Sequence, residues 1–441
     1  MTIQVREYAT LTTDRNQESS LDSAVVSKAT FDWLLDLHQQ WSGRAEILSE
    51  RGRQRLKLGS HVGYLESPSG EGIEILPKTE IVGQTEPNKL RSLLQTMLRS
   101  SADLPSREAS KASLQATQQP LHEWIIGEFL RELAELVRRG LRFDYQTVEN
   151  ESRFVRGQLD INRQIRQTPD KATHFHVRYA EFNPQRRENR LLRSALDSVI
   201  RLTKDNDHWR LANMLSHQLI DIEPYRTPIR ELSHWNNGKQ LQTYRSIKPW
   251  CRLVLLSLNP NFQKGLSQGI ALLFPMERLF ENYLGKCLGK QLLPPRSLKL
   301  QARSRYLLSH TVNNASDTSQ WFQLKPDFLV TYRQMNHTVL DAKWKLIDSK
   351  LNSSKDKYNI QQSDMYQMFA YGQKYLGGKG VLALIYPEHE NFRKPLPVFS
   401  FSEDLALWVI PFDLHQGILL HDNLLDSFER HTHESVSCLA S

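Results

Sequence analysis

Residues 326–345 read PDFLVTYRQMNHTVLDAKWK. The apolar runs on either side of residues 334–336 predict two strands joined by a turn, so that Asp327 lies beside Asp341. Side chains two apart share a face of a strand, which turns Asp341, Lys343 and Lys345 to one side. The other side holds Leu340, Ala342 and Trp344. This segment therefore predicts a hairpin strand with one charged and one apolar face.

Two carboxylates held side by side repel each other, and a hard divalent cation relieves that cost by taking oxygen ligands from both. Asp327 and Asp341 are therefore candidate ligands of Mg²⁺, or of Mn²⁺. Lys343 would orient or deprotonate an attacking water and offset the charge that develops on a phosphate. This set of residue types is suited to phosphodiester hydrolysis, and all three are candidate catalytic residues.

The surrounding elements predict an α/β unit. We expect a helix from Met276 to about Leu288, strands near 302–309, 321–333 and 337–346, and a helix from about Gln361 to Tyr375. Gly377 and Gly378 end that helix, and a buried strand follows at 381–386. The order α-β-β-β-α-β is typical of a mixed sheet covered by helices.

Three further stretches set the domain organisation. Residues 56–65 and 71–76 predict a hairpin in a small β-containing module, and the polar run 99–119 predicts a linker. The apolar pattern of 124–139 ends at Gly140 and predicts a helix. The whole chain is thus an α+β multidomain protein, and its expected divisions are an N-terminal module (1–98), the linker (99–119), a mainly helical middle domain (120–269) and the C-terminal α/β core (270–441).

Other groups compete for the same chemistry. Asp348-Ser-Lys350 repeats the Asp-x-Lys spacing in a polar loop, and Pro169-Asp170 repeats Pro-Asp with no matching lysine at strand distance. Asp341 and Lys343 also allow a plain interpretation as a surface ion pair on an edge strand. Only residues 326–343 combine the spacing with strand context and α/β order, which favours the catalytic interpretation.

Four side chains near the candidate site have secondary roles. Gln367 and Tyr371 are four apart on one helix face and are candidate DNA-binding groups, together with Lys345. The alternative interpretation is that the aromatic residues of this helix, Tyr366, Phe369 and Tyr371, pack in the core. Glu281, on the preceding helix, would add a further acidic ligand to the metal, or would be an ordinary solvated glutamate.

Composition narrows the class of protein. The chain has 441 residues, 39% of them hydrophobic, which is ordinary for a folded protein with more than one domain. Lys and Arg exceed Asp and Glu by 57 − 49 = 8, which favours a polyanionic partner. We expect no membrane segment, no secretory signal and a cytoplasmic location. Cys251, Cys287 and Cys438 are too few and too scattered for a thiolate metal cluster.

The motif Pro326-Asp327, Asp341-Ala-Lys343 and Gln367-x-x-x-Tyr371 resembles the PD-(D/E)xK nuclease superfamily. The sequence around this motif resembles McrC, the nuclease subunit of McrBC-type modified-cytosine restriction systems. The similar segments occur in the family's order and extend over roughly 120–430, with weaker similarity in the N-terminal module; they are residues 139–145, 155–161, 189–193, 366–371, 61–64 and 73–78.

The resemblance implies a Mg²⁺-dependent DNA endonuclease in which Asp327 and Asp341 are metal ligands and Lys343 is the catalytic lysine. It also implies a McrB-like AAA+ GTPase hexamer as partner, whose GTP hydrolysis this chain stimulates, with modified double-stranded DNA as substrate. The N-terminal module would dock on that partner. The sequence contains no G-x-x-x-x-G-K-[ST] phosphate loop, so we expect this chain to bind no nucleotide alone.

Two other functions remain open. A non-catalytic adaptor would dock on and activate an AAA+ ring, and its acidic pair would be structural. A plain DNA-binding protein would need only the basic excess. The intact set of Asp327, Asp341 and Lys343 favours catalysis.

Overall fold

The computed structural model describes residues 2–41, 47–52, 54–80, 86–101, 119–257, 269–292, 294–311 and 318–420. Most of the predicted linker 99–119, and Cys438, lie outside the described residues. The chain divides into two compact units, one formed by residues 1–106 and 273–441 and the other by residues 107–272. The N-terminal module and the C-terminal core therefore belong to the same unit.

The N-terminal module consists of two small sheets and two helices. One sheet has the order β1-β7-β6-β11 and the other the order β3-β2-β5-β4. The predicted hairpin is confirmed in part, because β6 and β7 pair antiparallel with Glu66 opposite Gly72. Residues 56–65 are not one strand, since β5 and β6 lie in different sheets. The elements are β1 (Thr2–Arg6), β2 (Thr10–Thr12), β3 (Ser23–Val25), α1 (Lys28–Gln40), β4 (Leu48–Glu50), β5 (Arg55–Leu58), β6 (His61–Glu66), β7 (Gly72–Leu76), α2 (Pro87–Ser101) and β11 (Ile270–Pro275).

The second unit combines a helical part with a β extension. The helix predicted at 124–139 is confirmed as α4, which ends at Gly140, where a φ of 90° favours glycine. Strands β8, β10 and β9 form a three-stranded sheet. The elements are α4 (Leu121–Arg139), β8 (Asp144–Ser152), β9 (Gln158–Leu159), α5 (Ile161–Ile165), η1 (Pro169–Lys171), β10 (Phe175–Asn183), α6 (Arg187–Leu202), α7 (Asn206–Gln218), α8 (Pro228–Leu232), η2 (Lys239–Tyr244) and α9 (Ile247–Ser257).

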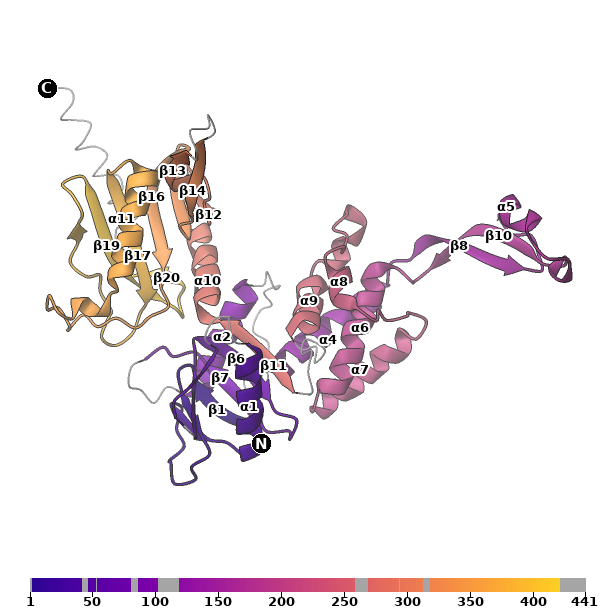
Figure 1. Ribbon diagram of the computed structural model, residues 1–441, viewed down its shortest axis with the longest axis horizontal. Helices are drawn as coiled ribbons and strands as arrows, with labels where there is room; N and C mark the ends of the chain where they lie inside the picture. The colour runs from indigo at the N-terminus through magenta and orange to yellow at the C-terminus, as the bar shows by residue number, and fades with distance from the viewer. Residues whose placement is uncertain are drawn as a thin grey trace. The chain divides into compact units, whose positions relative to one another are not determined.

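Residues 144–183 of this unit form what we call the β8–β10 extension (Figure 1). Strands β8 and β10 pair along their whole length, from Asp144 opposite Asn183 to Ser152 opposite Phe175. A cluster of large apolar side chains remains exposed on it, including Phe154 at 79% and Ile165 at 77%.

The C-terminal core is built on a seven-stranded mixed sheet in the order β12-β15-β16-β17-β19-β18, with β20 beside β19. Strands β16, β17 and β19 run parallel, and β12 and β15 are antiparallel to their neighbours. The elements are α10 (Met276–Gln291), β12 (Arg296–Leu300), β13 (Arg305–Thr311), β14 (Thr318–Leu324), β15 (Phe328–Tyr332), β16 (Met335–Ala342), η4 (Lys357–Asn359), α11 (Gln362–Leu376), β17 (Gly380–Pro387), β18 (Phe399–Ser400), β19 (Leu405–Asp413) and β20 (Ile418–Leu419).

Helices cover both faces of this sheet. α11 connects β16 to the parallel β17 (Figure 1). Its Met368 and Tyr375 pack into the core with Val339. From α10, Phe280 contacts Phe412 at a ring separation of 6.0 Å. Side chains alternate along a strand, so Phe412 of β19 and Val409, in the α11 core, point to opposite faces.

The prediction of one charged and one apolar strand face is wrong for most of β16. Thr338, Val339, Leu340 and Asp341 are all at most 2% exposed. β16 is an interior strand covered on both sides, and such strands are apolar on both faces. The charged groups gather only at its carboxyl end, where the strand stops at Ala342 rather than near residue 346.

None of the helices in the described part of the chain is long and apolar enough to span a membrane.

Candidate active site

Asp327 and Asp341 lie opposite each other at the ends of neighbouring strands. In the β15–β16 pair, Phe328 is opposite Leu340 and Leu329 is opposite Val339. The same register carried one residue further places Asp327 opposite Asp341. The backbone N–H of Ala342 donates a hydrogen bond of 2.8 Å to Asp327 Oδ2, which holds that carboxylate against the end of β16. The structure therefore brings the two predicted carboxylates together.

Burial makes ionisation of this pair costly. Burial first, and then the charge of Asp341, raise the pKa of Asp327 from 3.8 to about 7. Burial also raises the pKa of Asp341 above its ordinary value, against the opposing attraction of Lys343. Asp341 itself is only 1% exposed. Two ionised carboxylates at this place cost free energy, which a cation bound between them would offset.

Lys343 faces the acidic pair. Its Nζ lies 2.6 Å from Asp341 Oδ2 and 3.8 Å from Asp364 Oδ1. Burial by itself would lower the pKa of this ammonium, but the carboxylates of Asp341, Asp364 and Asp327 together raise it above its ordinary value. Lys343 therefore remains a cation at neutral pH. This state offers a positive charge and hydrogen-bond donors, and the predicted role of Lys343 in activating a water stays a prediction.

Gln367 and Tyr371 connect α11 to this lysine. Lys343 Nζ donates to Gln367 Oε1 at 2.9 Å, and Gln367 Nε2 donates to the Tyr371 hydroxyl at 2.8 Å. That hydroxyl in turn donates to the backbone carbonyl of Lys325 at 3.0 Å, next to Pro326. The shared helix face expected from the sequence is confirmed, and the polar groups on it hold the lysine. A DNA contact by these two residues stays a prediction.

Asp364 is a site residue that the sequence reasoning missed. It is 5% exposed, and its Oδ2 lies 3.3 Å from Lys345 Nζ. Lys345 also donates to Gln361 Oε1 at 2.8 Å. Asp364 precedes Gln367 by three residues, so the two share a helix face. This spacing is the sequence signal that could have identified Asp364 as a site residue. A DNA-binding role for Lys345 stays a prediction.

Glu281 lies near the pair but is engaged elsewhere. Its Oε1 accepts a hydrogen bond of 2.8 Å from Gln301 Nε2. Its charge contributes to the raised pKa of both Asp327 and Asp341. No group of three or more His, Cys, Asp or Glu side chains in the described residues is arranged to hold a metal ion. The effect of its charge on the pKa of the two aspartates shows that Glu281 is near them, and its ligation of a metal ion stays a prediction.

The two aspartates by themselves fit a magnesium ion. Mg²⁺ is commonly bound in phosphoryl-transfer sites through one or two carboxylates, with water and substrate oxygens completing its shell. Asp341 Oδ2 is buried and forms an ion pair of 2.6 Å with the Lys343 ammonium. A carboxylate oxygen has two lone pairs, so this ion pair leaves one for a metal ion.

The competing motifs are structural. Asp348 accepts hydrogen bonds from Asn391 Nδ2 at 3.0 Å and from the backbone N–H of Lys350 at 2.9 Å, so its carboxylate shapes a loop. Asp170 lies in the second unit, in the short helix η1, and none of the residues of η1 is buried.

A family model described as "McrBC 5-methylcytosine restriction system component" matches residues 56–387. The matched span is 387 − 56 + 1 = 332 of the 441 residues, and it includes the whole candidate site. No curated protein sequence matches the chain.

Two solved structures have a similar fold. One chain comes from a refined half-complex of a tetradecameric assembly of Thermococcus gammatolerans McrB AAA+ hexamers with bound McrC. It is 20% identical, with a TM-score of 0.67 over 100% of both chains. Another comes from the cryo-EM structure of the Thermococcus gammatolerans McrBC complex, with 21% identity and a TM-score of 0.50 over 66% of this chain and 88% of the other. At these identities the likeness establishes a shared fold.

Proposed function

Since the chain belongs to the McrBC 5-methylcytosine restriction system component family, we propose that it is the nuclease subunit of such a system. In this proposal it is a Mg²⁺-dependent endonuclease that cuts modified double-stranded DNA. The observation that carries the proposal is the convergence of Asp327, Asp341 and Lys343 at the carboxyl end of β16.

Asp327 and Asp341 would hold the metal, either Mg²⁺ or Mn²⁺. When bound, such an ion supplies Lewis-acid stabilisation of charge on a phosphate. The chain's own residues supply the rest. The Lys343 ammonium offers N–H donors and positive charge to a phosphate oxygen, and Gln367 fixes its direction through the 2.9 Å hydrogen bond.

We further propose a McrB-like AAA+ GTPase hexamer as partner, whose GTP hydrolysis this chain stimulates. The similar fold in the McrB assembly with bound McrC supports this choice. The absence of a phosphate-loop motif from the sequence supports a division of labour in which nucleotide hydrolysis belongs to the partner.

The β8–β10 extension is the surface that we propose for docking on this partner, in place of the N-terminal module expected from the sequence. Exposed apolar side chains are the typical mark of protein interfaces. In the described residues up to Ser101, Tyr8 is the one large hydrophobic residue that is exposed. The extension exposes several such residues, namely Tyr145, Phe154, Val155, Leu159, Ile161, Ile165 and Phe182.

The test is cleavage of methylated plasmid by the chain reconstituted with its AAA+ partner. Asp341→Asn keeps the size of the side chain but removes the charge that holds the metal. We expect cleavage to fall at least a thousandfold, on the order of 4 kcal/mol at the transition state, while stimulation of GTP hydrolysis persists. Asp348→Asn is the matched control and should cleave like wild type.

A non-catalytic adaptor makes a different prediction for the same experiment. It would stimulate GTP hydrolysis without cutting, so neither wild type nor Asp341→Asn would cleave DNA at any metal concentration. The lack of a third acidic ligand in the described part of the site is the observation that favours this alternative. Cleavage by wild type that Asp341→Asn leaves intact would contradict the proposed site.

A further inference from the structure

The lysine of the candidate site lies beyond the end of its strand. β16 ends at Ala342, so Lys343, Trp344 and Lys345 follow in a segment outside the regular sheet. The backbone N–H of Lys343 still donates to the carbonyl of Ile385 at 2.9 Å, whereas that of Lys345 donates to the carbonyl of Lys343 at 3.1 Å. A segment that has left the regular hydrogen-bonding pattern of a sheet depends on side-chain contacts to fix its position.

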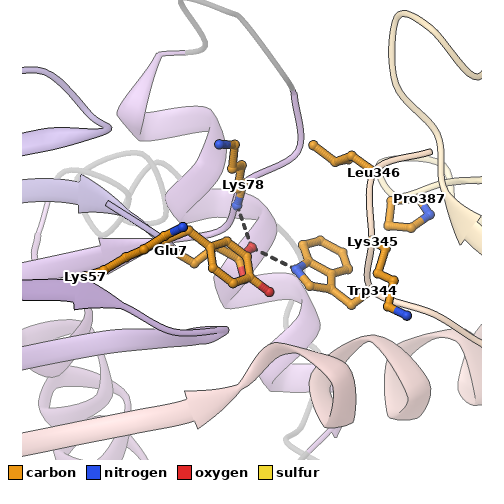
Figure 2. A pocket seen from close by; sticks show the side chains of 8 residues that line it. Glu7, Lys57, Lys78, Trp344, Lys345, Leu346 and Pro387 are labelled. Atoms are coloured by element: carbon orange, nitrogen blue, oxygen red, sulfur yellow. Dashed lines mark hydrogen bonds between the residues drawn. The ribbon is translucent and has the colours of Figure 1, made fainter. Parts of the chain in front are cut away.

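Trp344 is the side chain that anchors this segment. It is 5% exposed, and its ring lies 5.4 Å from that of Phe280 on α10. Its indole N–H donates a hydrogen bond of 2.8 Å to Glu7 Oε1, which belongs to the N-terminal module (Figure 2). Trp344 stands between Lys343 and Lys345 in the chain. A contact that fixes the indole therefore also fixes the backbone from which both lysine side chains start.

A cavity beside the indole gives it room to move. The cavity has a volume of about 350 Å³, lies within the first unit, and has Glu7, Trp344 and Lys345 in its wall (Figure 2). Interior side chains are normally close-packed, and a side chain that borders a void has fewer contacts on that side. The hydrogen bond to Glu7 is thus the contact that selects one orientation of the indole.

A tight turn after β1 presents the Glu7 carboxylate. The N–H of Ala9 donates to the carbonyl of Arg6 at 3.1 Å, and Tyr8 inside the turn has a φ of 63°, in the left-handed region that a tyrosine rarely adopts. The N–H of Lys78 donates to Glu7 Oε1 at 2.8 Å (Figure 2). Strained backbone of this kind persists where surrounding contacts maintain it, and it is common at functional sites.

A carboxyl group is costly at this position, which argues against a role in packing alone. Glu7 Oε2 is buried and has no hydrogen-bond partner among the described residues. Burial raises the pKa of Glu7 to about 7, against the two hydrogen bonds to Oε1, which favour the ionised form. An apolar side chain would avoid this cost. It would not supply what the carboxyl does, namely an acceptor for the N–H groups of Lys78 and Trp344.

We propose that Glu7 is a positioning residue of the nuclease site and acts on Lys343 through Trp344. The lysine is then held from two sides, since Gln367 of α11 binds its ammonium group and Glu7 fixes its backbone through the indole. The N-terminal module thereby becomes part of the nuclease site. This inference rests on the proposed role of Lys343 in DNA cleavage.

Hydrogen exchange read by mass spectrometry tests the positioning step on the full-length chain, without DNA or partner. Glu7→Leu removes the acceptor, and Trp344→Phe removes the donor but keeps a ring against Phe280. In both variants we expect the backbone N–H groups of residues 343–345 to exchange roughly tenfold faster, the factor expected for one lost buried hydrogen bond. Glu7→Gln keeps an amide oxygen for both donors and should exchange like wild type.

Tyr283→Phe is the matched control. It removes another buried hydrogen bond of the first unit, which the Tyr283 hydroxyl donates to the carbonyl of Leu414 at 3.0 Å. We expect a lower Tm and wild-type exchange at residues 343–345. Exchange in Glu7→Leu that is no faster than in Tyr283→Phe would overturn the inference.

DNA cleavage by the chain reconstituted with its AAA+ partner tests the consequence. At saturating DNA and Mg²⁺, Glu7→Leu and Trp344→Phe should cut about tenfold more slowly, because a small displacement of a catalytic group removes much of its effect. Glu7→Gln and Tyr283→Phe should cut like wild type. The affinity for Mn²⁺ should be unchanged in all four variants, since the β15–β16 pairing places Asp327 and Asp341.

The outcomes separate this inference from the nuclease proposal. Wild-type cleavage by Glu7→Leu, or equal slowing in Glu7→Leu and Glu7→Gln, would overturn the positioning role and leave the nuclease proposal intact. A wild type that cuts no DNA would instead overturn the nuclease proposal, and this inference with it.

Discussion

At the scale of single residues, the candidate site is a cluster of charged side chains that are largely buried away from water. Asp341 is 1% exposed, and the Lys343 ammonium at 2.6 Å provides one positive charge against several carboxylates. Such clusters are unfavourable for folding in the absence of a ligand. Evolution keeps them where binding or catalysis needs the unsatisfied charge.

The raised pKa of Asp327 predicts how stability depends on pH. The native protein retains a proton on this carboxyl up to about pH 7, whereas the unfolded chain loses it near 3.8. The metal-free protein should therefore lose stability as pH rises from about 4 to about 7, by on the order of 4 kcal/mol. Asp341→Asn removes the second charge, and its Tm should fall less over the same range, by a few °C.

Thermal unfolding in EDTA between pH 4.5 and 8 measures this difference. Asp348→Asn should follow the wild-type profile, because its side chain lies in a loop away from the pair. Parallel profiles for wild type and Asp341→Asn would mean that the two aspartates do not interact.

At the scale of elements, the long periodic segments could be predicted from the sequence. The helix expected from about Gln361 to Tyr375 and its Gly377 end, the hairpin that pairs Asp327 with Asp341, and the buried strand at 381–386 are all confirmed. Each depends on local signals, namely apolar period, turn residues and a glycine cap.

Other features depend on tertiary packing, which the sequence does not display. The single predicted strand 321–333 is two strands, β14 and β15, because Pro326 interrupts the strand. Between them, the hydroxyl of Tyr371 donates to the backbone carbonyl of Lys325, and that of Tyr375 donates to the carbonyl of Leu324. Asp364 and Glu7 look like ordinary surface acids in the sequence. Both are buried only because segments far apart in the chain meet over them.

Helix α11 must sit close to the sheet for Gln367 to hold Lys343. At Gly372 an added Cβ would lie 2.7 Å from Leu405 Cδ2 and 3.1 Å from Leu382 Cδ1, both in the core. Gly372→Ala should therefore push the helix outward, at a cost of about 1–3 kcal/mol that its better helix propensity offsets by about 1. We expect a lower Tm and slower DNA cleavage.

Gly289→Ala is the matched control in α10, where an added Cβ meets nothing within 4 Å. It should raise Tm slightly through helix propensity and leave cleavage unchanged. If both alanine variants cleave like wild type, the position of α11 does not control Lys343.

At the scale of the whole molecule, the apolar surface of the β8–β10 extension predicts where assembly is sensitive. Ile165→Asp should weaken association with the AAA+ ring at least tenfold, because Ile165 is 77% exposed and its replacement disturbs no core. Ile220→Asp is the matched control, at a residue of the same unit that is 70% exposed but outside the extension. Size-exclusion chromatography with light scattering measures both; equal assembly of the two variants would remove the extension from the interface.

The central claim is that Asp327 and Asp341 share one divalent ion next to Lys343. The most direct measurement is electron paramagnetic resonance titration of the full-length chain with Mn²⁺, which counts the bound ions and gives their affinity. Wild type and Asp348→Asn should each show a site that Mg²⁺ displaces, and Asp327→Asn and Asp341→Asn should each lose it. Binding of Mn²⁺ that persists in both aspartate variants would contradict the account.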